Sequence, residues 1–278
     1  MTRRGWLAAS LAAVDVLFAG ATDIMNTSTP EPRDIAFRAD HDGTEQKYVL
    51  LPPPTATADD ARRDVLIALH GHGSDRWQFI RQPRDECRAV RDFAARHGLW
   101  LVSPDYRATT SWMGPAAEAD LVQIIAGLKR DHRADRIFLC GGSMGGTACL
   151  TFAALHPEMI DGVASMNGTA NLVDYQNFQE AIQASFGGTR TEVPEEYRKR
   201  SAEFAVDRLT MPIGLAVSGK DTSVPPHSVL RLAQALQALG RPVLLIHRED
   251  LGHVTTYDDA LAILDHMLAH ARPPTTSP

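Results

Sequence analysis

The sequence predicts an α/β fold with a mostly parallel central sheet, helices on both faces and a small helical insertion. Three observations predict it. Short β-branched runs alternate with helical patterns across residues 34–273. The run at residues 65–69 is continuously apolar, as in a strand that is covered on both faces. Breaker residues such as Gly98 and Pro157 separate the elements.

The predicted elements follow in chain order. Extended segments at residues 35–38 and 46–51 end at three prolines, which is typical of an antiparallel edge. The remaining elements alternate in type: strand 65–69, helix 77–97, strand 99–103, helix 115–129, strand 137–140, helix 144–156, strand 160–166, strand 213–218, helix 227–239, strand 243–247 and helix 257–270. This order predicts one domain over residues 34–273.

Residues 171–208 interrupt this rhythm. The segment is polar, contains five aromatic residues and includes Gly187 and Gly188. We expect a small helical cap inserted over the sheet, and both a mobile lid and a fixed cover remain open.

Composition excludes several classes of protein. A chain of 278 residues with 44% hydrophobic residues can bury one large core. The formal net charge of −6 and the absence of a basic stripe argue against a nucleic-acid partner. Three cysteines without paired spacing indicate neither a disulfide framework nor a zinc knuckle. No metal or organic cofactor is expected.

The first 24 residues allow two interpretations. Arg3 and Arg4 precede a mildly apolar stretch that ends in small residues near position 21, which resembles an export signal of the twin-arginine type. Asp15 interrupts that stretch, and Met25 could be the start of a cytoplasmic protein, which would make residues 1–24 a non-native extension. The stretch is too short for a spanning helix, so no integral membrane association is expected.

The strongest chemical signal is the segment Gly-Gly-Ser-Met-Gly at residues 141–145, between a predicted strand and a predicted helix. This is the context that the G-x-S-x-G motif requires. Glycine at positions 141 and 145 permits a sharp turn that presents the hydroxyl of Ser143 above the sheet. The amide of Met144 then lies at a helix N-terminus, where it can donate to an oxyanion. Ser143 is the predicted nucleophile.

The loop His-Gly-His-Gly at residues 70–73 follows the first buried strand. Its glycines let the backbone approach a substrate carbonyl, and we expect the amide of His72 to be the second oxyanion donor. An alternative interpretation makes His70, His72 and Asp75 metal ligands of a metal-dependent hydrolase, because the H-x-H spacing is common in zinc sites.

The acid and the base are expected downstream, because this motif is followed in chain order by an acid and then a histidine. Asp221 lies in a turn after strand 213–218, where ligand-facing loops of α/β sheets lie. His253 follows strand 243–247 and a glycine, so it can turn toward Ser143. Asp221 is the predicted acid and His253 the predicted base. Asp250 is the rival acid, although it is poorly placed three residues before the histidine.

Five segments together resemble the α/β-hydrolases, and within them the esterase and prolyl-oligopeptidase-like group with its dienelactone hydrolase relatives. The segments are residues 70–73, 103–107, 141–146, 219–225 and 252–253. The resemblance covers about residues 45–270 and implies the α/β-hydrolase fold and a serine, aspartate and histidine triad. Dienelactone hydrolases use cysteine at the position of Ser143, so their activity is not implied.

The resemblance implies a serine hydrolase that forms an acyl-enzyme. Peptide-cleaving relatives usually carry a β-propeller before the catalytic domain, and these 278 residues leave no room for one. We therefore expect a small-molecule ester as substrate, with a serine peptidase as the alternative. Trp112, Met113 and Asn167 follow buried strands and are the expected substrate contacts. A non-catalytic binding protein is the third hypothesis, which the filled triad positions disfavour.

Overall fold

The computed structural model describes residues 1, 31–54 and 63–275, and within them one sheet of eight strands in the order β1-β2-β4-β3-β5-β6-β7-β8. The strands are β1 (Arg33–Arg38), β2 (Glu45–Leu51), β3 (Arg63–Leu69), β4 (Trp100–Pro104), β5 (Ala134–Gly142), β6 (Gly162–Met166), β7 (Ile213–Ser218) and β8 (Val243–Arg248). β1 pairs antiparallel with β2 and β2 with β4, whereas the other neighbours are parallel. The predicted mostly parallel sheet with an antiparallel edge is confirmed.

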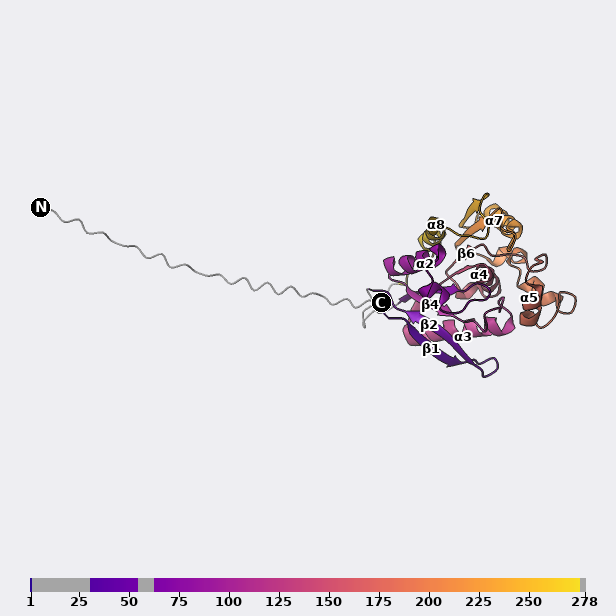
Figure 1. The fold of residues 1–278 in the computed structure, drawn as a ribbon, viewed down its shortest axis with the longest axis horizontal. Coiled ribbons are helices and arrows are strands. Elements are labelled where there is room, and N and C mark those ends of the chain that lie inside the picture. The colour runs from indigo at the N-terminus through magenta and orange to yellow at the C-terminus, as the bar shows by residue number, and fades with distance from the viewer. Residues whose placement is uncertain (2–30, 55–62, 276–278) are drawn as a thin grey trace.

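Helices cover both faces of this sheet (Figure 1). They are α1 (Gln78–Arg81), α2 (Asp85–Arg96), α3 (Pro115–His132), α4 (Met144–Leu155), α5 (Gln179–Phe186), α6 (Pro194–Lys199), α7 (His227–Ala238) and α8 (Tyr257–Ala269). Apolar residues of α1, α2 and α8 form one buried cluster, and those of α3, α4 and α7 form the other. The sheet therefore lies between two helical layers.

The continuously apolar run of β3 divides between these two layers. Val65, Ile67 and Leu69 belong to the cluster that includes α3 and α4, whereas Leu66 and Ala68 belong to the cluster that includes α2 and α8. Alternate side chains of a strand point to opposite faces, so a strand with two covered faces must be apolar throughout. Each large buried side chain contributes roughly 1.5–3 kcal/mol of transfer free energy.

One predicted helix is wrong in its extent. The pattern at residues 77–97 predicted a continuous helix, but the structure has α1 and α2 with a break around Pro83. Gln82 adopts extended backbone angles of −70° and 140° because a residue before proline avoids the helical region. The proline in the sequence was the signal for this break.

The insertion at residues 171–208 is helical, as predicted. It contains α5, α6 and two single 3₁₀ turns, η2 (Ala202–Phe204) and η3 (Val206–Arg208), while a further turn, η1 (Pro157–Met159), precedes β6. In Figure 1, α5 lies at the right-hand side of the molecule. Residues 2–24, for which the sequence leaves an export signal and a non-native extension open, lie outside the described residues. Among the helices that are described, none has the length and hydropathy to cross a membrane.

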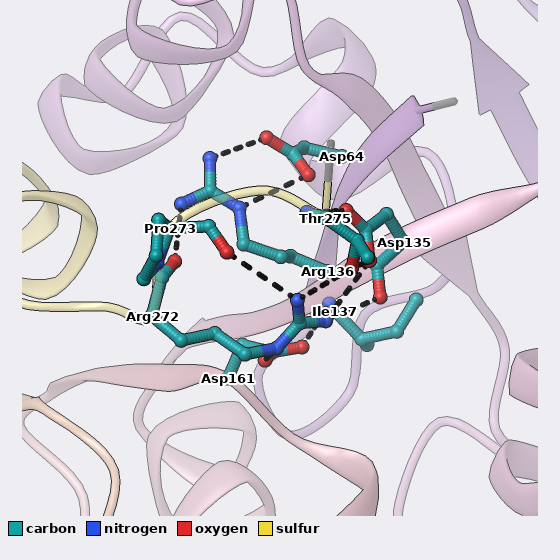
Figure 2. Close-up of polar contacts among 8 residues, drawn as sticks. All are labelled: Asp64, Asp135, Arg136, Ile137, Asp161, Arg272, Pro273 and Thr275. Carbon is teal, nitrogen blue, oxygen red and sulfur yellow. Dashed lines mark hydrogen bonds and ion pairs between the residues drawn. The ribbon is translucent and has the colours of Figure 1, made fainter. Parts of the chain in front are cut away.

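The C-terminal segment is fixed to the amino ends of the parallel strands (Figure 2). The guanidinium of Arg272 donates to Asp161 at 2.6 Å and to Asp135 at 3.1 Å, and the Arg272 carbonyl accepts a bond from Arg136 at 2.9 Å. Arg136 is also bidentate on Asp64. These contacts lie at the end of the sheet opposite to the carboxyl ends of its strands.

Candidate active site

Ser143 occupies a strained turn between β5 and α4. Its φ of 59° and ψ of −120° are rarely adopted by a residue with a side chain, and such strain costs on the order of 1–3 kcal/mol. The turn is possible because Gly141 and Gly145 approach each other: a Cβ on Gly141 would lie 2.6 Å from the Gly145 carbonyl carbon, and a Cβ on Gly145 would overlap the Leu69 carbonyl oxygen. The two glycines therefore hold Ser143 at the carboxyl end of β5.

Asp221 and His253 form a short, directed contact. His253 Nδ1 lies 2.5 Å from Asp221 Oδ2. The Asp221 side chain is fully buried, whereas the His253 side chain keeps 34% of its surface exposed. The other carboxylate oxygen, Oδ1, accepts bonds from the amides of Ser223 at 2.9 Å and Val224 at 2.8 Å. A carboxylate held in this way can orient the imidazole and stabilise its charged form.

Asp250, the rival acid, lies elsewhere. Its side chain is 93% exposed and pairs with Lys220 at 3.2 Å. The structure brings Asp221, and not Asp250, to His253.

Two backbone amides are free to bind an oxyanion. Met144 begins α4, so its N–H has no acceptor within the helix. In the loop at residues 70–73, Gly71 and Gly73 donate to Gln78 and Thr109, while the amide of His72 has no acceptor among the described residues. These are the two amides for which the sequence predicts a role as oxyanion donors.

The side chains of the loop do not match the metal alternative. The ring nitrogens of His70 lie 2.9 Å from the Gly71 carbonyl oxygen and 3.2 Å from the Asp105 carbonyl oxygen, and the ring is fully buried. Burial lowers the pKa of His70, which favours the neutral ring. Nδ1 of His72 accepts a bond from Trp112. Across residues 31–54 and 63–275, no group of three or more potential ligands converges on a metal position.

A cavity of about 480 Å³ is lined by Ser143, His253 and His72. The residues that line it come from the carboxyl ends of β3, β5, β6, β7 and β8, from α1 and α2, and from the cap: Gly71, His72, Ser74, Gln78, Arg84, Asp85, Glu86, Gly142, Ser143, Met166, Asn167, Phe178, Ser223, His253, Val254 and Thr255. Ser143 and His253 thus face one cavity, with Asp221 behind the histidine.

The three expected substrate contacts have different positions. Asn167 lines the cavity, and its amide nitrogen donates to Thr255 Oγ1 at 3.0 Å. Trp112 and Met113 are not among the residues that line it, and both are fully buried. Trp112 lies behind His72, to which its indole nitrogen donates at 3.1 Å. This corrects the expectation for Trp112 and Met113: a residue after a buried strand can support the wall of a pocket without facing the substrate.

Several residues of the cavity were not singled out from the sequence, among them Gln78 and Phe178. Gln78 is 2% exposed, and its carbonyl oxygen accepts a bond from the Gly71 amide at 2.8 Å, which fixes the loop. A glutamine within an otherwise apolar helix start was the available signal. Phe178 comes from the insertion and has a φ of 54°. No pattern distinguished it from the other aromatic residues of that segment.

Several solved structures share the fold. A puromycin hydrolase superposes with a TM-score of 0.69 at 22% identity, covering 87% of this chain and 39% of its own. An acylaminoacyl peptidase from Pyrococcus horikoshii gives 0.65 at 18% identity, covering 87% and 41%. An S-formylglutathione hydrolase from Agrobacterium tumefaciens gives 0.66 at 17% identity, covering 87% and 95%. The chain thus spans about two fifths of the length of the first two proteins.

Comparison with curated protein sequences found no match. The model of the prolyl oligopeptidase family matches residues 114–271, which is more than half of the chain and includes Ser143, Asp221 and His253. Together with the α/β-hydrolase architecture, this match leads to one conclusion: the chain belongs to the prolyl oligopeptidase family.

Proposed function

We propose that the chain hydrolyses carboxylic esters of small to medium size through an acyl-enzyme intermediate on Ser143. The observation that carries this proposal is the contact of 2.5 Å between His253 and Asp221 at the wall of the cavity that Ser143 also lines. Nucleophile, base and orienting acid are the components of acyl transfer by a serine enzyme.

The proposed mechanism follows from this arrangement. With Nδ1–H donating to Asp221, the neutral His253 ring has Nε2 free to accept the proton of Ser143 as the hydroxyl attacks the carbonyl. The amides of His72 and Met144 would stabilise the oxyanion, each by about 3 kcal/mol as judged from typical deletions of such donors. The imidazolium then protonates the leaving alcohol, and water releases the acid with His253 again as base.

Two observations support esters over peptides. A cavity of about 480 Å³ is in the range of small-molecule sites. The S-formylglutathione hydrolase structure, whose length this fold covers almost completely, is named for a small-molecule substrate. An amide also requires that its leaving nitrogen be protonated in a fixed geometry, whereas an ester with a good leaving group relaxes this requirement.

A peptidase is the second candidate. The family match and the acylaminoacyl peptidase structure favour it. Its catalytic groups would be the same, so only substrates can separate the two candidates.

The test is kcat/KM for p-nitrophenyl acetate, butyrate and palmitate beside a proline-containing peptide anilide, with Ser143→Ala as the control. We expect acetate and butyrate to be hydrolysed about a hundredfold or more faster than the anilide, because the anilide depends on general-acid catalysis. An anilide cleaved as well as the best ester would replace the esterase with the peptidase. Palmitate as the best substrate would contradict the small-ester preference.

A further inference from the structure

The imidazole of His72 is held in one orientation by the buried ring of Trp112. Trp112 Nε1 lies 3.1 Å from His72 Nδ1, and Trp112 is fully buried. An indole nitrogen can only donate a hydrogen bond, so Nδ1 of His72 must be the acceptor. A neutral imidazole with an unprotonated Nδ1 carries its hydrogen on Nε2. The contact with Trp112 therefore fixes the tautomer of His72.

Aromatic packing immobilises the same ring. The centroid of His72 lies 4.5 Å from that of Phe178 and 6.0 Å from that of Trp112, and the rings of Trp112 and Phe178 are 5.4 Å apart. Burial lowers the pKa of His72, which favours the neutral ring. Protonation of Nδ1 would also direct an N–H group against the indole N–H. The three rings thus form a rigid wall with one polar edge.

The polar edge of this wall is available to a ligand. His72 lines the cavity beside Ser143, and its Nε2 atom is neither bonded to an acceptor among the described residues nor shut off from solvent. This side-chain donor is separate from the backbone amide of His72, which the proposed mechanism assigns to the oxyanion. The cavity therefore contains one more oriented N–H group than hydrolysis of a plain ester uses.

We propose that the Nε2–H group of His72 binds a second oxygen of the substrate, an ether, carbonyl or hydroxyl oxygen separate from the scissile ester group. The adjoining apolar part of the substrate packs against Phe178, whose ring contacts His72 and is 38% exposed. This inference rests on the proposed esterase function and deepens it, because it assigns a substrate class: esters with an additional hydrogen-bond acceptor in the acyl or the alcohol group.

The experiment uses matched pairs of esters that differ by exchange of a methylene group for an ether oxygen. For the acyl side the pair is p-nitrophenyl butyrate and p-nitrophenyl methoxyacetate, and for the alcohol side butyl acetate and 2-methoxyethyl acetate. The ratio of kcat/KM within each pair is compared among wild type, His72→Phe, His72→Gln and the control His247→Phe, an exposed ring on β8. Intrinsic reactivity and general losses of activity cancel in this comparison.

A single neutral hydrogen bond corresponds to a change of roughly fivefold, so His72→Phe should lower the preference for the ether by about fivefold in one of the pairs. His72→Gln should retain most of the preference, because the glutamine amide can accept from Trp112 and donate into the cavity. His247→Phe should not change it. Equal ratios in wild type and His72→Phe for both pairs would overturn the inference, while hydrolysis of the plain esters would still support the proposed function.

The tautomer has a direct readout that does not depend on activity. In protein labelled with ¹⁵N-histidine, the resonances of His72 are assigned by their loss in His72→Phe. We expect a protonated Nε2 and an unprotonated Nδ1 at neutral pH. A proton on Nδ1 would overturn the inference even if the protein hydrolyses esters.

Discussion

Asp221 shows how single residues prepare the site. Its two oxygens accept three bonds, two from backbone amides and one from His253, within a fully buried side chain. Asp250, three residues before His253, has none of these contacts. Both aspartates lie in loops after strands, and the structure separates them by burial and by the backbone amides that bind only Asp221.

This difference predicts the effect of two matched substitutions. Asp221→Asn should lower kcat by about 10³- to 10⁴-fold, because an amide that donates toward Nδ1 favours the wrong tautomer of His253. Asp250→Asn should change kcat by less than about twofold, as expected for an exposed pair. The measurement is kcat for p-nitrophenyl butyrate with each variant, after circular dichroism has shown that both fold. The reverse ranking would assign the acid to Asp250.

At the scale of elements, a buried arginine fastens the cap to the helices below it. Arg200, in the cap between α6 and η2, is 1% exposed and donates to Glu118 of α3 at 2.7 Å and to the Met113 carbonyl at 2.9 Å. Glu118 also lies 2.8 Å from Nε2 of His156, at the end of α4. These bonds favour a fixed cover over a mobile lid.

Arg200→Met tests this attachment. Removing the arginine leaves Glu118 and the Met113 carbonyl without the hydrogen bonds that Arg200 donates. Breaking a buried ion pair lowers the free energy of unfolding by about 3–5 kcal/mol. The loss is smaller here because Glu118 is 22% exposed. Lys199→Met, which removes an exposed pair with Glu196, should cost less than about 1 kcal/mol. Urea unfolding of both variants measures the difference. Equal stability of the two would show that Arg200 does not hold the cap.

Glu118 gives this attachment a pH dependence. Burial raises its pKa, but the bonds and charges of His156 and Arg200 outweigh burial and hold the pKa at about 2. Because this pKa is lower than that of the unfolded chain, near 4.5, the contribution to stability is complete above pH 4.5 and is lost as the pH falls toward 2.

The expected result is a loss of stability between pH 4.5 and 2 that is smaller in Glu118→Gln than in wild type. Thermal unfolding across this pH range measures it, with the exposed Glu158→Gln as the control. If wild type and Glu118→Gln lose stability in parallel, Glu118 does not carry this pH dependence.

At the scale of the whole molecule, the parallel topology explains why residues far apart in the sequence meet. His72, Ser143, Asp221 and His253 follow β3, β5, β7 and β8, whose carboxyl ends lie at one edge of the sheet. The charged network of Arg136 and Arg272 fixes the other end of the same sheet (Figure 2). The candidate active site and the charged network thus lie at opposite ends of the strands.

The sequence predicted the features that have strong local causes. Continuous apolar runs marked the buried strands, and the glycines around Ser143 marked its strained turn. The break at Pro83 was missed because helical periodicity continued across it. The burial of Trp112, and the approach of Phe178 to His72, depend on contacts between distant segments, and no periodic pattern records such contacts.

Formation of an acyl-enzyme on Ser143 can be tested directly. Wild type and Ser143→Ala are mixed with p-nitrophenyl butyrate, quenched within milliseconds to seconds, and analysed by intact mass and peptide mapping. We expect a burst of p-nitrophenol, or at least a trapped butyryl adduct on the peptide with Ser143, in wild type alone. Hydrolysis of the ester by Ser143→Ala at a rate near that of wild type would contradict it.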